Sequence, residues 1–184
     1  MNILLAMYGA VSQGVLWGIM CLGLYITYKV LDFADLTVDG SFALGGAVNA
    51  ALIVLDCNPL VALFISFIAG GISGIVTGLL NTKLKIPGIL AGILTMIALY
   101  SINIRIMGRA NISLLGETTL MTQISSLINT STTTTSFIIG TIFSVIIIFA
   151  MYWFFGTEIG SAIRATGNNE KMVRAQGVNT DNMK

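Results

Sequence analysis

Long apolar stretches separated by short polar ones run along the chain, and their lengths predict membrane-spanning helices. A helix needs about 20 mostly apolar residues to cross about 30 Å of hydrocarbon. One stretch reaches that length only if its helix starts near Leu36, which brings Asp39 to the membrane edge, so it is either a complete span or a broken one. The predicted spans are residues 3–28, 36–55, 59–80, 88–107 and 137–156. The pattern predicts an all-α, polytopic integral membrane protein with about five transmembrane helices.

Polar residues between the spans mark where helices begin. Asn58 followed by Pro59 is a capping residue before a proline at the first helical position, where the missing N–H costs nothing. Pro87 opens the next span in the same way. The last linker is long and rich in Ser and Thr, and within it residues 119–128 are predicted to form a short interfacial helix.

The composition supports this class and excludes several functions. Of the 184 residues, 55% are hydrophobic and 9% are charged, with a mean hydropathy of +0.91, whereas a soluble domain carries about 25% charged residues. The net charge of +1 gives no reason to expect nucleic acid as a partner. The chain has no histidine, and its cysteines, Cys21 and Cys57, are expected to be free thiols. We expect no catalytic residue, no metal and no cofactor.

The distribution of lysine and arginine predicts the orientation, because cytoplasmic loops carry the excess of these residues. With five spans, only Arg105 and Arg109 fall on one side of the membrane. The other side holds Lys29, Lys83, Lys85, Arg164, Lys171, Arg174 and Lys184. The N-terminus is therefore expected outside the cell and the C-terminus inside, with a membrane domain over residues 1–156 and a cytoplasmic segment over 157–184.

A stripe of small residues follows the third span. Ala62, Ser66, Gly70, Gly74 and Gly78 recur every four residues. In lipid, helices associate by close van der Waals approach, which small residues at this spacing permit. We expect helix packing at Gly70, Gly74 and Gly78, either as plain bundle contacts or along a face that lines a pathway and slides.

The segment between the first two spans is rich in carboxylates. Asp32, Asp35 and Asp39 lie within eight residues. One interpretation is that Thr37 or Asp39 caps the next helix and the other carboxylates are solvated. The other is that a broken helix start places polar groups along a solute path, because irregular backbone at membrane depth is tolerated where it lines a cavity. On this second interpretation, Asp39, Thr37 and Ser41 border the path.

The tail after the last span is polar and has helix start and stop signals. Asn169, after Asn168, is a candidate N-cap for a two-turn helix over residues 170–176, and Gly177 is its candidate stop. A short capped helix in water is suited to docking on a partner, with Met172 and Val173 as its exposed apolar residues. An ordinary cytosolic loop is the alternative.

Two motifs in this chain resemble those of a known family. The tail has the pattern G-x-A-I-R-A followed by spaced Asn, Ala and Gly, carried by Gly160, Ala162, Ile163, Arg164, Ala165, Asn169, Ala175, Gly177 and Asn179. It is similar to the cytoplasmic loop of permeases in ABC importers of the branched-chain amino acid and sugar group. The stretch LDFADLTVDGSFALGGAV resembles the subgroup that includes tryptophan- and tyrosine-type uptake systems. The resemblance covers nearly the whole chain.

This resemblance implies a permease subunit in a bacterial plasma membrane, working as a homo- or heterodimer with a second permease copy. Cytoplasmic ATP-binding subunits and an extracellular solute-binding protein would be the other partners, and the solute would be an amino acid or a similar small molecule. The short tail helix would be the coupling helix, and the chain itself has no phosphate-binding G-x-x-x-x-G-K-[ST] motif, so ATP hydrolysis is expected elsewhere. The implied ATPase-coupling residues are Arg164, Asn169, Glu170, Met172, Val173, Arg174, Ala175 and Gly177. Family members continue through further spans, so a C-terminally truncated chain is expected.

Other classes account for the sequence less well. An ion-coupled secondary carrier would place ionisable residues within its spans, and here only Arg105 and Asp39 qualify, both near span ends. A membrane-embedded protease would need carboxylates deep in two spans or metal-binding histidines. A non-transporting assembly protein would use the tail as a tether, and recovery of an ATPase partner would separate it from a permease.

Overall fold

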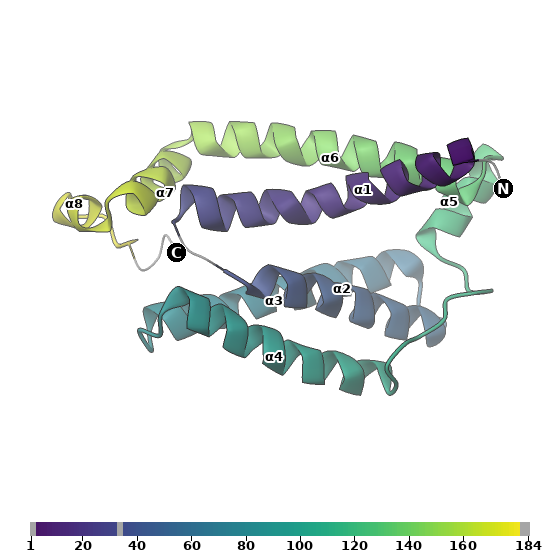
Figure 1. Cartoon of the computed structure of the whole chain (residues 1–184), viewed down its shortest axis with the longest axis horizontal. Coiled ribbons are helices and arrows are strands. Elements are labelled where there is room, and N and C mark those ends of the chain that lie inside the picture. Colours follow the sequence, from purple (N-terminus) through teal and green to yellow (C-terminus); the bar gives the residue numbers. More distant parts are fainter. Residues whose placement is uncertain (1–2, 33–34, 181–184) are drawn as a thin grey trace. The chain divides into compact units, whose positions relative to one another are not determined.

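The computed structural model describes residues 3–32 and 35–180 (Figure 1), and every regular element in that part of the chain is a helix. The elements are α1 (Ile3–Tyr25), the π-helical turn η1 (Ile26–Val30), α2 (Thr37–Val54), α3 (Pro59–Thr82), α4 (Gly88–Met107), α5 (Leu120–Ile128), α6 (Thr132–Gly156), α7 (Glu158–Asn168) and α8 (Glu170–Ala175). The predicted all-α class is confirmed.

Five helices of the described residues are long and apolar enough to cross a membrane. They cover Ala6–Val30, Thr37–Val54, Pro59–Thr82, Gly88–Met107 and Thr132–Gly156. The five predicted spans are thereby recovered. The second is one continuous helix, so the broken alternative is wrong. The short interfacial helix expected near residues 119–128 is present as α5.

The fifth span begins five residues before the predicted start because its threonine-rich run satisfies its own polar groups. The Ser131 hydroxyl accepts a hydrogen bond from the Thr134 N–H at 3.4 Å and so caps α6. Inside the helix, the Thr135 hydroxyl donates to the Ser131 carbonyl at 3.2 Å. Hydroxyls bonded to carbonyls one turn back can enter a helix without exposing an unsatisfied group.

The chain divides into two compact units, each described here by itself. The unit of residues 34–123 contains the bundle of α2, α3 and α4, in which α2 lies against both other helices. The hydroxyls of Thr37 and Thr77 share a hydrogen bond of 2.8 Å, which joins the start of α2 to the end of α3. A side chain at Gly40 would lie 3.3 Å from the Met96 backbone, so α2 and α4 approach closely. Consecutive contacts show that α2 runs antiparallel to α3 and parallel to α4.

The small-residue stripe of α3 faces α2 along only part of its length. Ala62 and Ser66 are buried, and a side chain at Gly70 would lie 3.8 Å from the Ser41 carbonyl. At Gly74 and Gly78, no described atom lies within 4 Å of where a side chain would begin. A four-residue repeat drifts around a helix of 3.6 residues per turn, so the buried face passes instead to Ser73 and Thr77. Packing at Gly74 and Gly78 remains a prediction that concerns partners outside this bundle.

The unit of residues 1–33 and 124–184 contains α1, α6, α7 and α8. Helices α1 and α6 lie side by side and run in the same direction (Figure 1). Near their first turns, the Ser12 hydroxyl donates to the Thr133 carbonyl at 3.3 Å, and the rings of Tyr8 and Phe137 lie 5.4 Å apart. The polar tail belongs to this unit, since α7 packs on the far ends of both spans.

Candidate functional site

The start of α2 is capped by a carboxylate, although not by one of the predicted residues. The Asp35 Oδ1 atom accepts a hydrogen bond from the Thr37 N–H at 2.8 Å, two residues ahead in the chain. The suggestion that Thr37 or Asp39 caps this helix is therefore wrong. A carboxylate just before a helix reaches the unpaired N–H groups of its first turn more readily than one already inside it.

The three predicted solute-path residues do not share one surface of α2. Thr37 is buried against Thr77 of α3, and Ser41 is half-buried and donates to the Val38 carbonyl at 3.0 Å. Asp39 lies on the opposite side of the helix and is exposed. Within this unit the exposed polar group at the start of α2 is thus Asp39. Whether it borders a solute path stays a prediction.

Close approach of α4 holds the start of α2 in place. A side chain at Gly92 would lie 2.8 Å from the Leu36 nitrogen and 3.3 Å from the Asp35 carboxylate. Only glycine fits here without displacing backbone. This contact links the capping carboxylate to the bundle.

The bundle also buries an amide that sequence reasoning did not single out. Asn103 of α4 is 6% exposed, and its Oδ1 atom has no hydrogen-bond partner among the described residues. Most buried polar groups are paired. The hydroxyls buried elsewhere in this bundle are bonded, for example Thr95 to the Ala91 carbonyl at 3.0 Å. Asn103 is therefore the unsatisfied acceptor in an otherwise satisfied interior.

Helix α7 packs directly on η1, the turn that completes the first span, and on the end of α6. A side chain at Gly160 would collide with the Phe154 carbonyl and lie 2.6 Å from the Phe155 Cα. A side chain at Gly167 would collide with the Val30 carbonyl. These glycines are seven residues apart and occupy one face of the helix. Between them, Arg164 donates from Nη2 to the Phe155 carbonyl at 2.8 Å.

The sequence contains a start signal for α7 at Thr157. Thr157 accepts a hydrogen bond from the Gly160 N–H at 3.3 Å, and Glu158 follows in the first turn. A threonine cap with an acidic first-turn residue is a helix start signal. Thr157 and the pair Gly160 and Gly167 are the functional candidates that sequence reasoning missed or left without a role.

The predicted short tail helix is confirmed as α8. The Asn169 side chain accepts from the Met172 N–H at 3.1 Å and caps it, and Gly177 has a φ of +88° after its last turn. Gly177 donates to the Arg174 carbonyl at 3.1 Å and Val178 to the Val173 carbonyl at 3.4 Å. This pair of bonds is a Schellman motif, in which the left-handed position favours glycine.

One predicted feature of the tail is wrong. Val173 was expected to be exposed, yet it is 2% exposed, because α8 packs against α7 and the chain up to Thr180 turns back to bond with Arg174. Arg174 is exposed, as a residue at the edge of a contact would be, and it donates from Nη2 to the Thr180 hydroxyl at 2.7 Å and pairs with Glu170 at 3.3 Å. Met172 and Ala175 remain exposed, so α8 presents a narrower surface than predicted.

The remaining predicted coupling residues therefore have distinct places. Asn169, Glu170, Val173, Arg174 and Gly177 shape α8 and its stop, and Arg164 lies on α7 against the end of α6. Within the described ranges, no cluster of three metal-ligating side chains was found. The geometry defines a multi-pass helical membrane protein with a folded polar segment fixed to the ends of two spans.

The comparisons with known proteins identify the family. Residues 6–184 match the family described as the permease component of branched-chain amino acid transport systems. The chain belongs to this family, as the resemblance predicted, and it is a multi-pass protein of the bacterial plasma membrane. No solved structure matches it.

The curated relatives that this chain matches are longer proteins. It is 36% identical over 174 residues to a tyrosine transport system permease protein of Clostridioides difficile, covering 94% of this chain and 56% of the relative. It is 24% identical over 192 aligned positions to a ribose import permease protein of Escherichia coli, covering 97% of this chain and 54% of the relative. An uncharacterised protein of Rickettsia prowazekii is 43% identical over 121 residues. The chain spans about half the length of the curated relatives it matches.

Proposed function

We propose that this chain is the membrane-spanning permease subunit, or the first part of one, of an ATP-driven importer for a small solute. Family membership over residues 6–184 is the observation that carries the proposal. In this view ATP is hydrolysed by a separate cytoplasmic subunit, an extracellular protein delivers the solute, and a second permease copy completes the pathway. The name of the Clostridioides difficile relative supports an aromatic amino acid as the solute.

The contact with the ATP-binding subunit is proposed to be the exposed surface of α8. This helix is capped at both ends and held by α7, so a force on it is transmitted to the backbone where α1 and α6 end. Met172 is its exposed apolar side chain, with Lys171 beside it and Ala175 permitting close approach. A groove on the partner would bury Met172, while the charge of Lys171 would favour orientation.

The proposed orientation has the N-terminus outside and the tail in the cytoplasm. In a chain of five spans the first and the last run in the same direction, so the parallel course of α1 and α6 supports termini on opposite sides of the membrane. The basic residues then indicate which side is the cytoplasm. Lys29 and the basic tail then lie at the same end of their unit, in agreement with the positive-inside rule. Reporter fusions at Lys85 and Lys184 should behave as cytoplasmic, and a fusion near Thr122 as external; an external signal at Lys184 would contradict this orientation.

The coupling proposal is tested by co-purification of the ATP-binding subunit with the assembled transporter. Met172→Asp should reduce recovery of the ATP-binding subunit and solute uptake, because it places a charge in the proposed contact. Gly177→Val should uncouple ATP hydrolysis from uptake, because a β-branched residue disfavours the left-handed stop. Val173→Ala is the matched control for loss of internal packing. Full recovery and uptake with Met172→Asp would contradict the proposed contact.

The solute-path proposal concerns Asp39 and its neighbours Thr37 and Ser41. Asp39→Asn should lower uptake in the assembled transporter while membrane insertion and thermal stability stay normal, since the carboxylate is exposed and has no hydrogen-bond or ion-pair partner among the described residues. Asp35→Asn is the comparison variant, because it weakens the helix cap and should lower stability instead. Unchanged uptake with Asp39→Asn would remove Asp39 from the path. Co-purification of the ATP-binding subunit with these variants would show that the transporter is assembled. It would thereby exclude the alternative of a non-transporting protein.

A further inference from the structure

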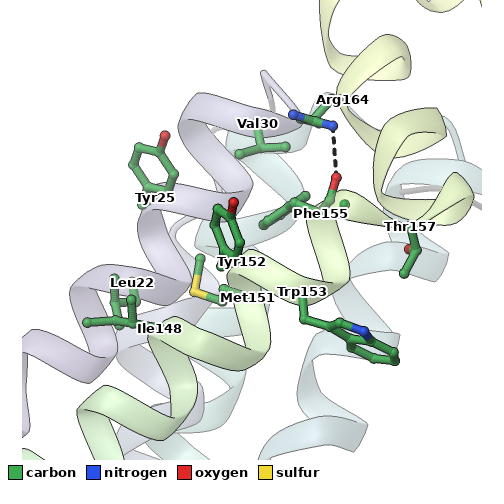
Figure 2. A pocket seen from close by; sticks show the side chains of 11 residues that line it. Leu22, Tyr25, Val30, Ile148, Met151, Tyr152, Trp153, Phe155, Thr157 and Arg164 are labelled. Atoms are coloured by element: carbon green, nitrogen blue, oxygen red, sulfur yellow. Dashed lines mark hydrogen bonds between the residues drawn. The ribbon is translucent and has the colours of Figure 1, made fainter.

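A groove lies between α1 and α6 where the two spans meet α7. Its volume is about 770 Å³, and it is open along one side. Figure 2 shows Leu22 and Ile148 at one end and Arg164 at the other. The groove therefore runs from a purely apolar end to an end that carries a positive charge.

The polar end is built to receive a negative charge. Arg164 donates one N–H to the Phe155 carbonyl at 2.8 Å, and in the described part of the chain no carboxylate forms an ion pair with it. A guanidinium has five N–H donors, so most of its donors remain for another acceptor. The bond to Phe155 also fixes the guanidinium at the mouth of the groove (Figure 2). Glu158, the nearest acid along α7, does not line the groove.

The walls have the composition of a membrane interface. Tyr25 of α1 and Tyr152 and Trp153 of α6 line the groove and are exposed. Such aromatic residues gather where the apolar membrane meets its polar headgroups. Towards the middle of the spans, the lining changes to Leu22 and Ile148. The order of charge, amphipathic rings and aliphatic side chains matches the order of phosphate, glycerol and acyl chain in a phospholipid.

We propose that this groove binds one anionic phospholipid, with its phosphate on Arg164 and an acyl chain along Leu22 and Ile148. Basic pockets between transmembrane helices at the cytoplasmic side are a known setting for anionic headgroups. The lipid would fill the gap beside α7 and hold the ends of α1 and α6 at the distance that α7 requires. The inference does not depend on the solute or on the ATP-binding subunit.

The test is lipid-dependent thermal stability of the purified protein in mild detergent. Added phosphatidylglycerol should raise the unfolding temperature of the wild type more than phosphatidylcholine does, and native mass spectrometry should find one retained anionic lipid. Soluble glycerol phosphate should have no effect, because it has no acyl chain. Arg164→Gln should raise the half-saturating concentration of phosphatidylglycerol about fivefold, the equivalent of about 1 kcal/mol for one basic residue at a membrane surface.

Three further variants keep the proposal falsifiable if Arg164→Gln folds poorly. Arg164→Lys keeps the charge and should retain selectivity for phosphatidylglycerol. Ile148→Trp fills the apolar end and should reduce lipid retention while the protein folds normally. Lys83→Gln removes one positive charge from the other unit and should bind lipid as the wild type does.

Four results would overturn the proposal. Equal stabilisation by phosphatidylglycerol and phosphatidylcholine would show that Arg164 does not discriminate between an anionic and a zwitterionic headgroup. Stabilisation by glycerol phosphate alone would assign the site to a free phosphate compound. Unchanged lipid retention in Ile148→Trp would place the lipid elsewhere. Crosslinks from a cysteine at position 148 to a second copy or to further protein spans, with no retained lipid, would show that protein covers the groove.

Discussion

The two compact units of this chain hold their membrane helices together in different ways. In the bundle of α2, α3 and α4, 22–28% of the residues in each apolar window are buried, against 6% in each of α1 and α6. The bundle is joined along its length by small and hydroxyl side chains, such as Thr37 and Thr77. The α1 and α6 pair is fixed most tightly at one end, where α7 lies on its backbone. The bundle therefore resembles a self-sufficient scaffold, and the pair resembles two exposed spans tied to a folded polar segment.

The largest effect is expected where α7 meets η1, at the end of the first span. Gly167→Ala introduces a side chain that collides with the Val30 carbonyl and lies 2.9 Å from the Leu31 Cα, so α7 must move. We expect a loss of about 1–3 kcal/mol, with faster hydrogen exchange in α7 and the end of α1. Gly18→Ala is the control, because no described atom lies within 4 Å of its new carbon. Equal exchange in both variants would show that α7 is not held at this contact.

A smaller loss of stability, from the same kind of close contact, is expected in the bundle at Gly92. Gly92→Ala would press on the Leu36 nitrogen at 2.8 Å and disturb the Asp35 cap, whereas the rest of the bundle can still hold α2. The melting temperature should fall, with a loss of about 1–2 kcal/mol. Gly71→Ala on α3 has no described atom within 4 Å and serves as the control. If Gly92→Ala melted at the temperature of this control, the tight contact between α4 and α2 would be disproved.

The unsatisfied amide gives a prediction of opposite sign. Asn103→Leu removes a buried acceptor without a partner and keeps a similar volume, so the stability of the isolated chain should rise by about 1 kcal/mol. Ser101→Leu, on the exposed side of the same helix, controls for general hydrophobicity. Thermal unfolding in detergent measures both. A loss of stability in Asn103→Leu would mean that the amide is bonded in the protein as it exists in the membrane.

The smallest effect is expected on the outer part of the α3 stripe. Gly74→Leu should change the stability of this chain by less than about 0.5 kcal/mol, because nothing described lies within 4 Å of its side-chain position. Gly70→Leu, one turn earlier and against the Ser41 carbonyl, should cost more. Melting curves of the pair make the comparison. If Gly74→Leu lowered the stability of the assembled transporter but not that of the isolated chain, a partner helix would lie on this face.

Several features of the tail show how far local signals reach. The cap at Asn169 and the stop at Gly177 were predictable because each depends on a few adjacent residues and on the conformational freedom of glycine. The burial of Val173 was not, because it depends on how α8 packs against α7, a separate helix. Arg164 was assigned to the coupling surface by its motif, yet the structure places it in the groove beside α6.

The sequence by itself determined the class of the protein and most span boundaries, because membrane thickness and the need to satisfy every backbone hydrogen bond leave only long apolar helices. It also determined the family, through residues that lie close together in the chain. Only the tertiary structure decided which faces meet. Asp35 rather than Thr37 caps α2, the stripe of α3 leaves its partner after Gly70, and Gly167 lies against the end of η1. These are contacts between residues far apart in sequence or on different turns. They depend on how the buried face of each helix rotates along its length and on how closely two backbones can approach. Neither quantity can be predicted from a short stretch of sequence.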